Sequence, residues 1–188
     1  MDETSISGTA DSSPTALRLA RGLEEASSLD GTVAMVDDLL ERTLGRSAWL
    51  TAMLRGHSIG HPLHPLLTDL PLGLWLGTGV LDVFGGRASH DAADTLLCLG
   101  NVAALPTIAA GLADWRTGDQ PIRRVGLVHA GLNATGLALY AASWRLRRRG
   151  HRGAGVALSM AGGMTMIVSG YLGGHLSFQL RSPRDDRI

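Results

Sequence analysis

The 188-residue chain carries 17 basic and 17 acidic side chains, so it has no net charge that would attract nucleic acid. A single cysteine, Cys98, excludes an intramolecular disulfide and a Cys-X-X-Cys metal or redox site. The Gly-X-Ser-X-Gly, phosphate-loop and His-Glu-X-X-His motifs are missing. Hydrolysis is therefore disfavoured, and an electron-transfer or accessory membrane protein is favoured over such an enzyme.

The N-terminal part of the chain is polar. Residues 1–29 are rich in acidic, Ser and Thr residues, which predicts a mostly disordered tail. This tail lacks the apolar centre of a signal peptide. Residues 30–56 predict an amphipathic helix, since Val33, Leu40 and Leu44 recur on one helical face. We expect this helix to pack against the rest of the protein or to lie on the membrane surface.

Four long apolar stretches follow, and the predicted helices cover about residues 62–83, 94–114, 124–145 and 153–177. A helix rises 1.5 Å per residue, so about 20 apolar residues cross the hydrocarbon core of a bilayer. These stretches also lack the polar face of a helix that packs on a soluble core. The sequence predicts an all-α, integral membrane four-helix bundle over residues 57–178, followed by a polar C-terminal tail over residues 179–188.

Four spans place both chain termini on one side of the cell membrane, which we call the proximal side. Arginines near the membrane are slightly more numerous on this side, and that favours the cytoplasm for it. The expected partner along the spans is the lipid bilayer, and homo-oligomerisation stays open. Nucleic acid is not expected as a partner.

Ionisable side chains lie near the proximal ends of the spans. Burying such groups in hydrocarbon costs a few kcal/mol each, so intramembrane Asp and His residues are candidates for a functional site. At about 1.5 Å per residue, Asp69 and His129 lie roughly 10 Å inside the proximal boundary. The candidates from different spans are His61, His64, Asp69, Asp114, His129 and His175. For Asp69 and Asp114, support of a histidine ring nitrogen and capping of a helix end are alternatives.

A proline lies inside the first span. Pro71 removes a backbone donor and frees the carbonyl oxygen of Leu67 one turn earlier. Such kinks are common in membrane helices, where neighbouring helices satisfy the freed group. The proline therefore either widens the bundle near the candidate site or has no functional meaning.

Several runs of sequence resemble one bacterial membrane family, catalogued as domain of unknown function 2231. They are Gly60-His61-Pro62-Leu63-His64-Pro65, Gly111-Leu112-Ala113-Asp114-Trp115, Val128-His129-Ala130-Gly131-Leu132-Asn133 and Tyr171-Leu172-Gly173-Gly174-His175. The resemblance implies a four-helix membrane domain. Some members are joined to a Rieske iron–sulfur domain, which implies a redox setting. One cysteine cannot supply the ligands of a Rieske cluster, so an electron partner would be a separate protein or a quinone.

The leading hypothesis is that the protein holds haem b between its helices and transfers electrons. Two imidazoles at similar depth on facing helices can ligate the iron. His64 with His129 fits if the first and third spans are diagonal in the bundle, and His129 with His175 is the alternative on adjacent helices. Arginines at the proximal surface could bind the haem propionates, and the candidates are Arg116, Arg123 and Arg124.

Two further hypotheses stay open. A transition metal ion such as Zn, Fe or Cu could bind imidazole and carboxylate ligands drawn from His61, His64, Asp69, Asp114, His129 and His175. Alternatively, the protein is a membrane scaffold or partner subunit without a cofactor, in which the histidines serve packing. These hypotheses predict different absorption spectra.

Overall fold

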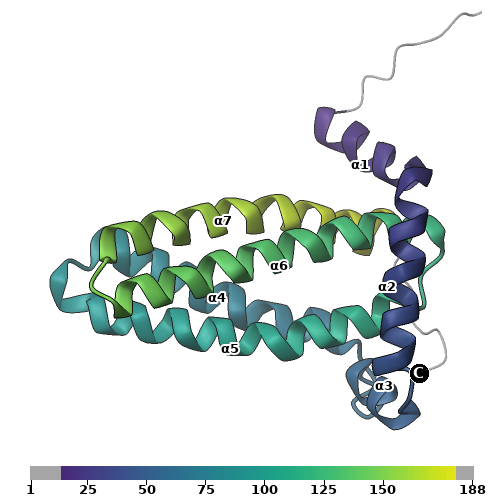
Figure 1. The fold of residues 1–188 in the computed structure, drawn as a ribbon, viewed down its shortest axis with the longest axis horizontal. Helices are drawn as coiled ribbons and strands as arrows, with labels where there is room; N and C mark the ends of the chain where they lie inside the picture. Colours follow the sequence, from purple (N-terminus) through teal and green to yellow (C-terminus); the bar gives the residue numbers. More distant parts are fainter. Residues whose placement is uncertain (1–13, 181–188) are drawn as a thin grey trace, which may run out of the picture.

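The computed structural model describes residues 14–180, a range that contains helices and no strand. Its main body is a bundle of four long helices, each long and apolar enough to cross a membrane. These helices are α4 (Leu63–Phe84), α5 (His90–Trp115), α6 (Gln120–Arg148) and α7 (Arg152–Gly174) (Figure 1). Each predicted span falls on one of them, and the prediction of an all-α membrane bundle is confirmed.

The four helices alternate in direction and form an up-and-down bundle (Figure 1). Helix α4 packs extensively on α5, and α6 packs extensively on α7. Smaller contacts join α5 to α6 and α7 to α4. Helices α4 and α6 are therefore diagonal to each other. We call the end at which α4 begins and α7 ends the proximal end, and the opposite end the distal end.

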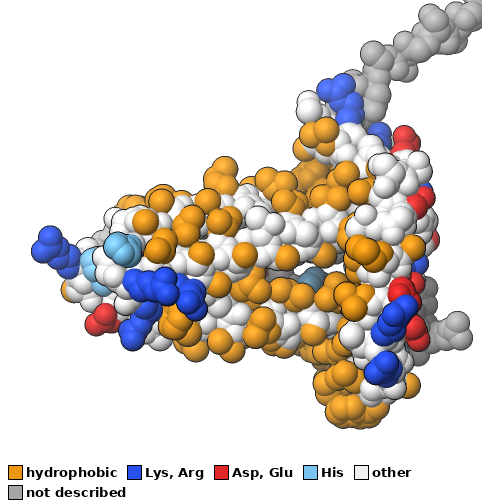
Figure 2. Space-filling model, viewed as in Figure 1, with side chains coloured by type: hydrophobic (Ala, Val, Ile, Leu, Met, Phe, Trp, Pro, Cys, Tyr) orange, Lys and Arg blue, Asp and Glu red, His pale blue; other side chains and the backbone are white. Residues whose placement is uncertain are grey.

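The outer surface of the bundle is apolar. Leu76 on α4 is 71% exposed and Ile167 on α7 is 69% exposed. Figure 2 shows apolar side chains along the flank of the bundle, with charged groups at its distal end and over the N-terminal helices. An exposed apolar surface between two polar ends is what contact with a lipid bilayer requires.

Three shorter helices precede the bundle: α1 (Thr15–Glu25), α2 (Asp30–Thr43) and α3 (Ala48–Leu54). Helix α2 crosses the proximal end of the bundle at a steep angle to its axis (Figure 1). As predicted, its buried face carries Val33 and Leu40, which pack with Trp115.

The predicted disorder over residues 1–29 is wrong for the part that the structure describes. Residues 15–25 form α1, and Ser27–Leu29 form a short 3-10 turn. Helix α1 is stabilised by tertiary contact, because its Ala20 is buried against Val125 and Leu172 of the bundle. Residues 1–13, and residues 181–188 of the C-terminal tail, lie outside the described part.

The predicted amphipathic helix over residues 30–56 is two helices. Helix α2 ends at Thr43, and α3 starts after Ser47, whose hydroxyl accepts a hydrogen bond from the backbone N–H of Leu50 at 3.2 Å. Serine at this position satisfies one of the free N–H groups of a helix start. The break turns the chain back toward the start of α4.

The loop before α4 depends on glycine. Gly56 has a φ of 79°, and a Cβ atom there would lie 1.9 Å from the carbonyl oxygen of His61. Only glycine fits such a close approach in the left-handed region. The loop delivers the chain to α4 with His64 as the second residue of the helix.

Candidate histidine site

His64 is fixed by a hydrogen bond to the neighbouring helix. Its Nδ1 lies 2.8 Å from the carbonyl oxygen of Thr107 on α5. The carbonyl can only accept, so Nδ1 carries the proton and Nε2 keeps its lone pair. The ring lies close to Gly111, where an added Cβ would be 2.8 Å from Cε1. Glycine at this position therefore allows the imidazole to reach the backbone of α5.

Thr107 also lies near the backbone carbonyl that Pro71 leaves without its helical donor. The hydroxyl of Thr107 donates mainly to the carbonyl oxygen of Ala103 on its own helix, at 2.9 Å, and lies 3.4 Å from the carbonyl oxygen of Leu67, the group that loses its helical donor to the proline. Thr107 thus contacts α4 twice, through its side chain and through its carbonyl. The carbonyl that the proline leaves without its helical donor therefore faces a polar side chain of α5 close to His64.

His129 on α6 is bound in the same way to α7. Its Nδ1 donates to the carbonyl oxygen of Ser169 at 2.9 Å, and an added Cβ on Gly173 would lie 3.1 Å from its Cε1. The amide Nδ2 of Asn133 lies 2.9 Å from its Nε2 and donates to that lone pair. The Ser169 hydroxyl in turn donates to Oδ1 of Asn133 at 3.0 Å.

The two histidines lie at the same depth on helix faces that point toward each other. Trp75 and Tyr140 stack across the bundle, with ring centroids 4.3 Å apart and planes 13° from parallel. Trp75 follows His64 by eleven positions, and Tyr140 follows His129 by eleven. Eleven residues are almost three whole turns, so each aromatic shares the face of its histidine. Both histidines therefore lie about 16 Å from the stacked pair, toward the proximal end.

His175 is directed away from this pair. It begins a π-helical turn, His175–Gln179, that continues α7, and its Nε2 lies 2.7 Å from Oε1 of Glu24 on α1. Two residues on a helix differ by about 200° in direction, so when Gly173 faces His129, His175 points to the other side. The structure thus gives no support to His129 with His175 as a ligand pair, because His175 is buried against α1.

The other candidate ligands are also separate from the pair. His61 is exposed in the loop before α4, and Asp69 is exposed on that helix. Asp114 is half-buried near the end of α5. Within residues 14–180, no group of three or more His, Cys, Asp or Glu side chains is placed to hold a metal ion. The six predicted metal ligands are not brought together, and His64 with His129 remain.

The match to a known family covers all of the histidines in this site. The family model described as "Predicted membrane protein (DUF2231)" matches residues 60–182, which include α4 to α7. The chain belongs to the DUF2231 family. This confirms the family that the sequence motifs indicated. No curated protein and no solved structure matches the chain.

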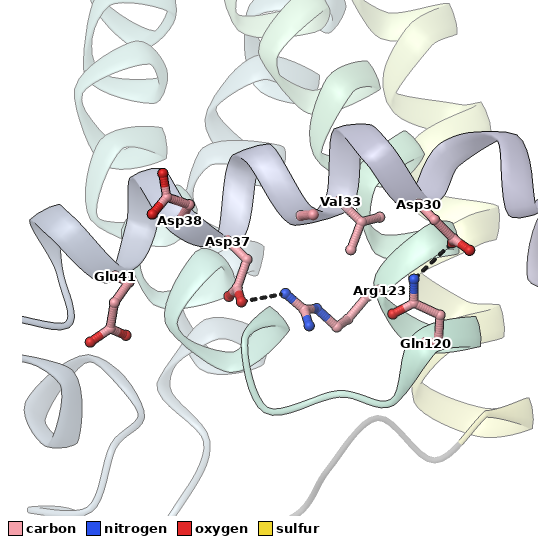
Figure 3. A pocket seen from close by; sticks show the side chains of 8 residues that line it. Asp30, Val33, Asp37, Asp38, Glu41, Gln120 and Arg123 are labelled. Atoms are coloured by element: carbon pink, nitrogen blue, oxygen red, sulfur yellow. Dashed lines mark hydrogen bonds and ion pairs between the residues drawn. The ribbon is translucent and has the colours of Figure 1, made fainter.

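The three arginines predicted to bind propionates lie in the DUF2231 domain, but their partners precede it. Arg124 binds Asp30 through two hydrogen bonds of 2.6 and 2.7 Å. Arg123 pairs with Asp37 at 2.9 Å, and Arg116 pairs with Glu41 and Asp37. Figure 3 shows Asp30, Asp37 and Glu41 along α2, which lies over Arg123. A propionate would have to compete with these carboxylates.

The contacts of Asp30 with α6 lower the pKa of its carboxyl group. Its hydrogen bonds from Arg124 and then from Gln120 lower the pKa of the Asp30 carboxyl to about 2. Gln120 Nε2 lies 2.7 Å from Asp30 Oδ1 (Figure 3). The contact between α2 and α6 is thus made by a carboxylate that stays charged well into the acid range.

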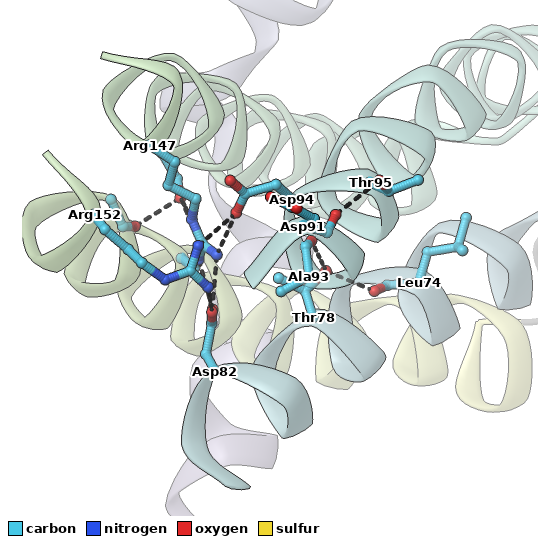
Figure 4. Close-up of polar contacts among 12 residues, drawn as sticks. Leu74, Thr78, Asp82, Asp91, Ala93, Asp94, Thr95, Arg147 and Arg152 are labelled. Atoms are coloured by element: carbon cyan, nitrogen blue, oxygen red, sulfur yellow. Dashed lines mark hydrogen bonds and ion pairs between the residues drawn. The ribbon is translucent and has the colours of Figure 1, made fainter. Parts of the chain in front are cut away.

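An ion-pair cluster at the distal end of the DUF2231 domain was not predicted. Arg147 binds Asp82 at 2.6 Å and Asp94 at 3.2 Å, and Arg152 binds the same two carboxylates at 2.7 and 2.9 Å (Figure 4). The side chains of Arg147 and Asp82 are 0% and 3% exposed. Opposite charges at equal depth on four different helices were the signal that could have identified the cluster.

Proposed function

We propose that His64 and His129 hold haem b between α4 and α6, and that the protein transfers electrons as a membrane subunit. The observation that carries this proposal is the pair itself. The two imidazoles lie at equal depth on diagonal helices, each with Nδ1 bound to a backbone carbonyl. Histidines that ligate a metal commonly donate the other ring N–H to such a group, which fixes the ring and leaves Nε2 for the metal.

The number of donors favours haem over a single metal ion. Haem needs only two ligands from the protein, and His64 and His129 would be the residues that hold it. A protein-bound Zn ion usually needs three or four protein ligands, and a third His, Cys, Asp or Glu is not placed beside this pair in the described residues. Bound haem b supplies a one-electron Fe(II)/Fe(III) couple.

The residues of the chain have defined roles in this proposal. Thr107 and Ser169 hold the two rings through their carbonyls, and Gly111 and Gly173 leave room for the rings beside the helices. Coordination at Nε2 of His129 requires the Asn133 amide to leave that atom. This loses one hydrogen bond, worth about 1 kcal/mol. The electron partner is a quinone or a separate redox protein that approaches from the membrane or its surface.

One observation favours a second candidate function. Both ring nitrogens of His129 have partners within the protein, so this histidine can serve as a packing element of a scaffold without a cofactor. In that case, the loss of His129 would lower the stability of the protein and remove no cofactor.

An absorption spectrum of the protein in mild detergent separates these functions. The protein is purified from haem-supplied cells and measured oxidised and after reduction with dithionite, with metal analysis of the same sample. We expect a Soret band and sharp reduced α and β bands, both lost in His64→Ala and His129→Ala. His151→Ala, in the exposed distal loop, is the control and keeps the bands. A folded wild-type protein without haem rejects the proposal: stoichiometric metal then favours a metal site, and no metal favours the scaffold.

A further inference from the structure

We propose that α4–α5 and α6–α7 are two copies of one helical hairpin, and that the ligand of His64 and His129 lies on the pseudo-two-fold axis that relates them. The placement of the ligand rests on the proposed function. The equivalence of the two hairpins rests on independent observations of sequence and contact. The inference makes His64 and His129 equal contributors to one symmetric site.

The first observation is a repeat in sequence. When α4 is aligned with the residues 65 positions later, identical residues coincide at His64/His129, Leu67/Leu132, Leu72/Leu137, Leu74/Leu139 and Leu81/Leu146. Similar residues coincide at Trp75/Tyr140 and Thr78/Ser143. A shift of 62 positions aligns α5 with α7 and places Gly100 on Gly162, Thr107 on Ser169 and Gly111 on Gly173.

The second observation is that aligned residues make the same contacts. His64 donates to Thr107 and lies at Gly111, and His129 donates to Ser169 and lies at Gly173. These four partners are two aligned pairs, so the imidazole, the carbonyl and the glycine recur as a set.

The agreement extends toward the distal end. The hydroxyl of Thr78 lies 3.4 Å from the carbonyl oxygen of Ala93, and that of Ser143 lies 2.6 Å from the carbonyl oxygen of Gly155. Ala93 and Gly155 are again aligned positions. The rings of Trp75 and Tyr140 likewise lie where an added Cβ on Gly100 or Gly162 would contact them. The two hairpins therefore share their internal packing along most of their length.

The third observation locates the axis. Two equivalent residues can contact each other only where the symmetry axis passes between them. Trp75 stacks on its equivalent Tyr140, and Asp82 forms an ion pair with its equivalent Arg147 at 2.6 Å. Both hairpins start at the proximal end, so the axis runs along the bundle, as in transporters built from parallel repeats.

The histidines form the proximal layer on this axis. His64, Trp75 and Asp82 are separated by eleven and seven positions, spacings that keep all three on one face of α4. The aromatic pair fills the axis at mid-bundle and the ion pair fills it at the distal end. A ligand of the two histidines therefore lies on the axis at the proximal layer and meets the same surroundings from both halves.

Asn133 is the main departure from symmetry at this layer. Its equivalent in α4 is Thr68, whose hydroxyl binds the carbonyl oxygen of His64 at 2.8 Å and leaves Nε2 of that ring alone. The hydrogen bond of Asn133 to Nε2 thus distinguishes two otherwise matched imidazoles. Replacing Asn133 by Thr makes the two halves alike at this position.

The test compares the two histidines as a matched pair. We expect His64→Ala and His129→Ala to lose haem equally. The gentler variants His64→Met and His129→Met should shift the reduced bands by the same amount. Asn133→Thr should retain the haem. If both variant proteins fold but only one of the two histidine substitutions removes haem, the symmetric site is contradicted. The proposal that the protein binds haem would still stand.

A second measurement does not depend on haem. In ¹⁵N-histidine-labelled protein from haem-deficient cells, nuclear magnetic resonance should show two rings protonated at Nδ1, one removed by each histidine substitution. A single such ring shows that the hairpins are not equivalent. Haem-free wild-type protein from haem-supplied cells overturns the proposed function and the ligand's placement, and the two tautomers then still decide whether the hairpins are copies.

Discussion

The rings of Trp75 and Tyr140 stack 4.3 Å apart and join the diagonal helices α4 and α6 at the centre of the bundle. Trp75 is 6% exposed and its indole N–H donates to Asn101 at 3.1 Å, while Tyr140 is 5% exposed. The pair is thus buried between the two hairpins, and Trp75 is also fixed by a hydrogen bond.

Trp75→Ala should destabilise the bundle by about 3–5 kcal/mol, the usual cost of removing a large buried aromatic side chain. Leu76→Ala, at a 71% exposed neighbouring position, is the control and should change stability little. Unfolding in detergent, followed by near-ultraviolet circular dichroism, measures both. Equal stability of the two variants would show that the stack does not hold the bundle together.

Breaking the distal cluster on one side should also be costly. In Asp82→Asn, the guanidinium of Arg147, whose side chain is 0% exposed, loses its closest charged partner. Removing one member of a buried ion pair typically costs about 3–5 kcal/mol. Because Asp94 still faces Arg147 at 3.2 Å, we expect a cost near or below the lower end of this range. The double variant Asp82→Leu with Arg147→Leu should recover part of this loss. Thermal unfolding of the three proteins in the same detergent tests the expectation, and a double variant less stable than Asp82→Asn contradicts it.

Acid should loosen α2 from the bundle. The hydrogen bonds of Arg124 lower the pKa of Asp30 from an ordinary 3.8 to about 2. The unfolded or undocked state therefore binds a proton first, so this contribution to stability is complete above pH 3.8 and is lost as the pH falls toward 2.

Hydrogen exchange of α2 measured between pH 5 and pH 2, corrected for intrinsic rates, should show protection falling in this window. Asp30→Asn should weaken protection at pH 5 and flatten its pH dependence. Asp38→Asn is the control, since Asp38 pairs with Arg42 on its own helix. An Asp30→Asn protein with the wild-type profile would show that other groups set the response.

Two glycines should be essential for placing the imidazoles. A Cβ at Gly111 would lie 2.8 Å from two atoms of the His64 ring, and one at Gly173 would lie 3.1 Å from His129. Gly111→Ala and Gly173→Ala should therefore displace the rings and, if haem is bound, weaken its binding by about 10- to 100-fold. The effect should be larger at Gly111, where the contact is closer.

Gly131→Ala is the matched control for these glycines, because a Cβ there would meet no atom within 4 Å. Each variant is diluted into a solution of a haem-binding competitor. The fraction of folded protein that retains haem is then compared between the variants. Retention in Gly111→Ala equal to that in Gly131→Ala would show that the ring of His64 can shift without loss.

The sequence predicted the long helices well because their signal is local. The helix from Gln120 to Arg148, for example, is long and apolar enough to cross a bilayer, and this can be judged from its own residues alone. The depth of His129 followed from the same count of residues. The helix Thr15–Glu25 could not be read in this way, since its burial depends on Val125 and Leu172, more than 100 positions later.

The site was predictable only as a set of candidates. A backbone carbonyl carries no signal in the sequence, so the bonds of His64 to Thr107 and of His129 to Ser169 could not be foreseen. Arg147 lies near the end of α6, whereas its partners Asp82 and Asp94 lie on other helices. Which polar residues come into contact depends on how the helices pack against one another. A single sequence does not reveal that packing.

The distal cluster also bears on how strongly the membrane voltage affects a charge that moves to the histidines. Two arginines and two aspartates neutralise one another across the far end of the bundle, and the aromatic pair fills the middle. The distal half of the axis is therefore filled by side chains that carry no net charge, while His64 is the second residue of its helix at the proximal end. Moving one charge across a full bilayer costs about 2.3 kcal/mol per 100 mV. A charge that reaches the histidines from the proximal side crosses roughly a third of a hydrocarbon core about 30 Å thick, so the membrane voltage changes its energy by only about a third of this amount.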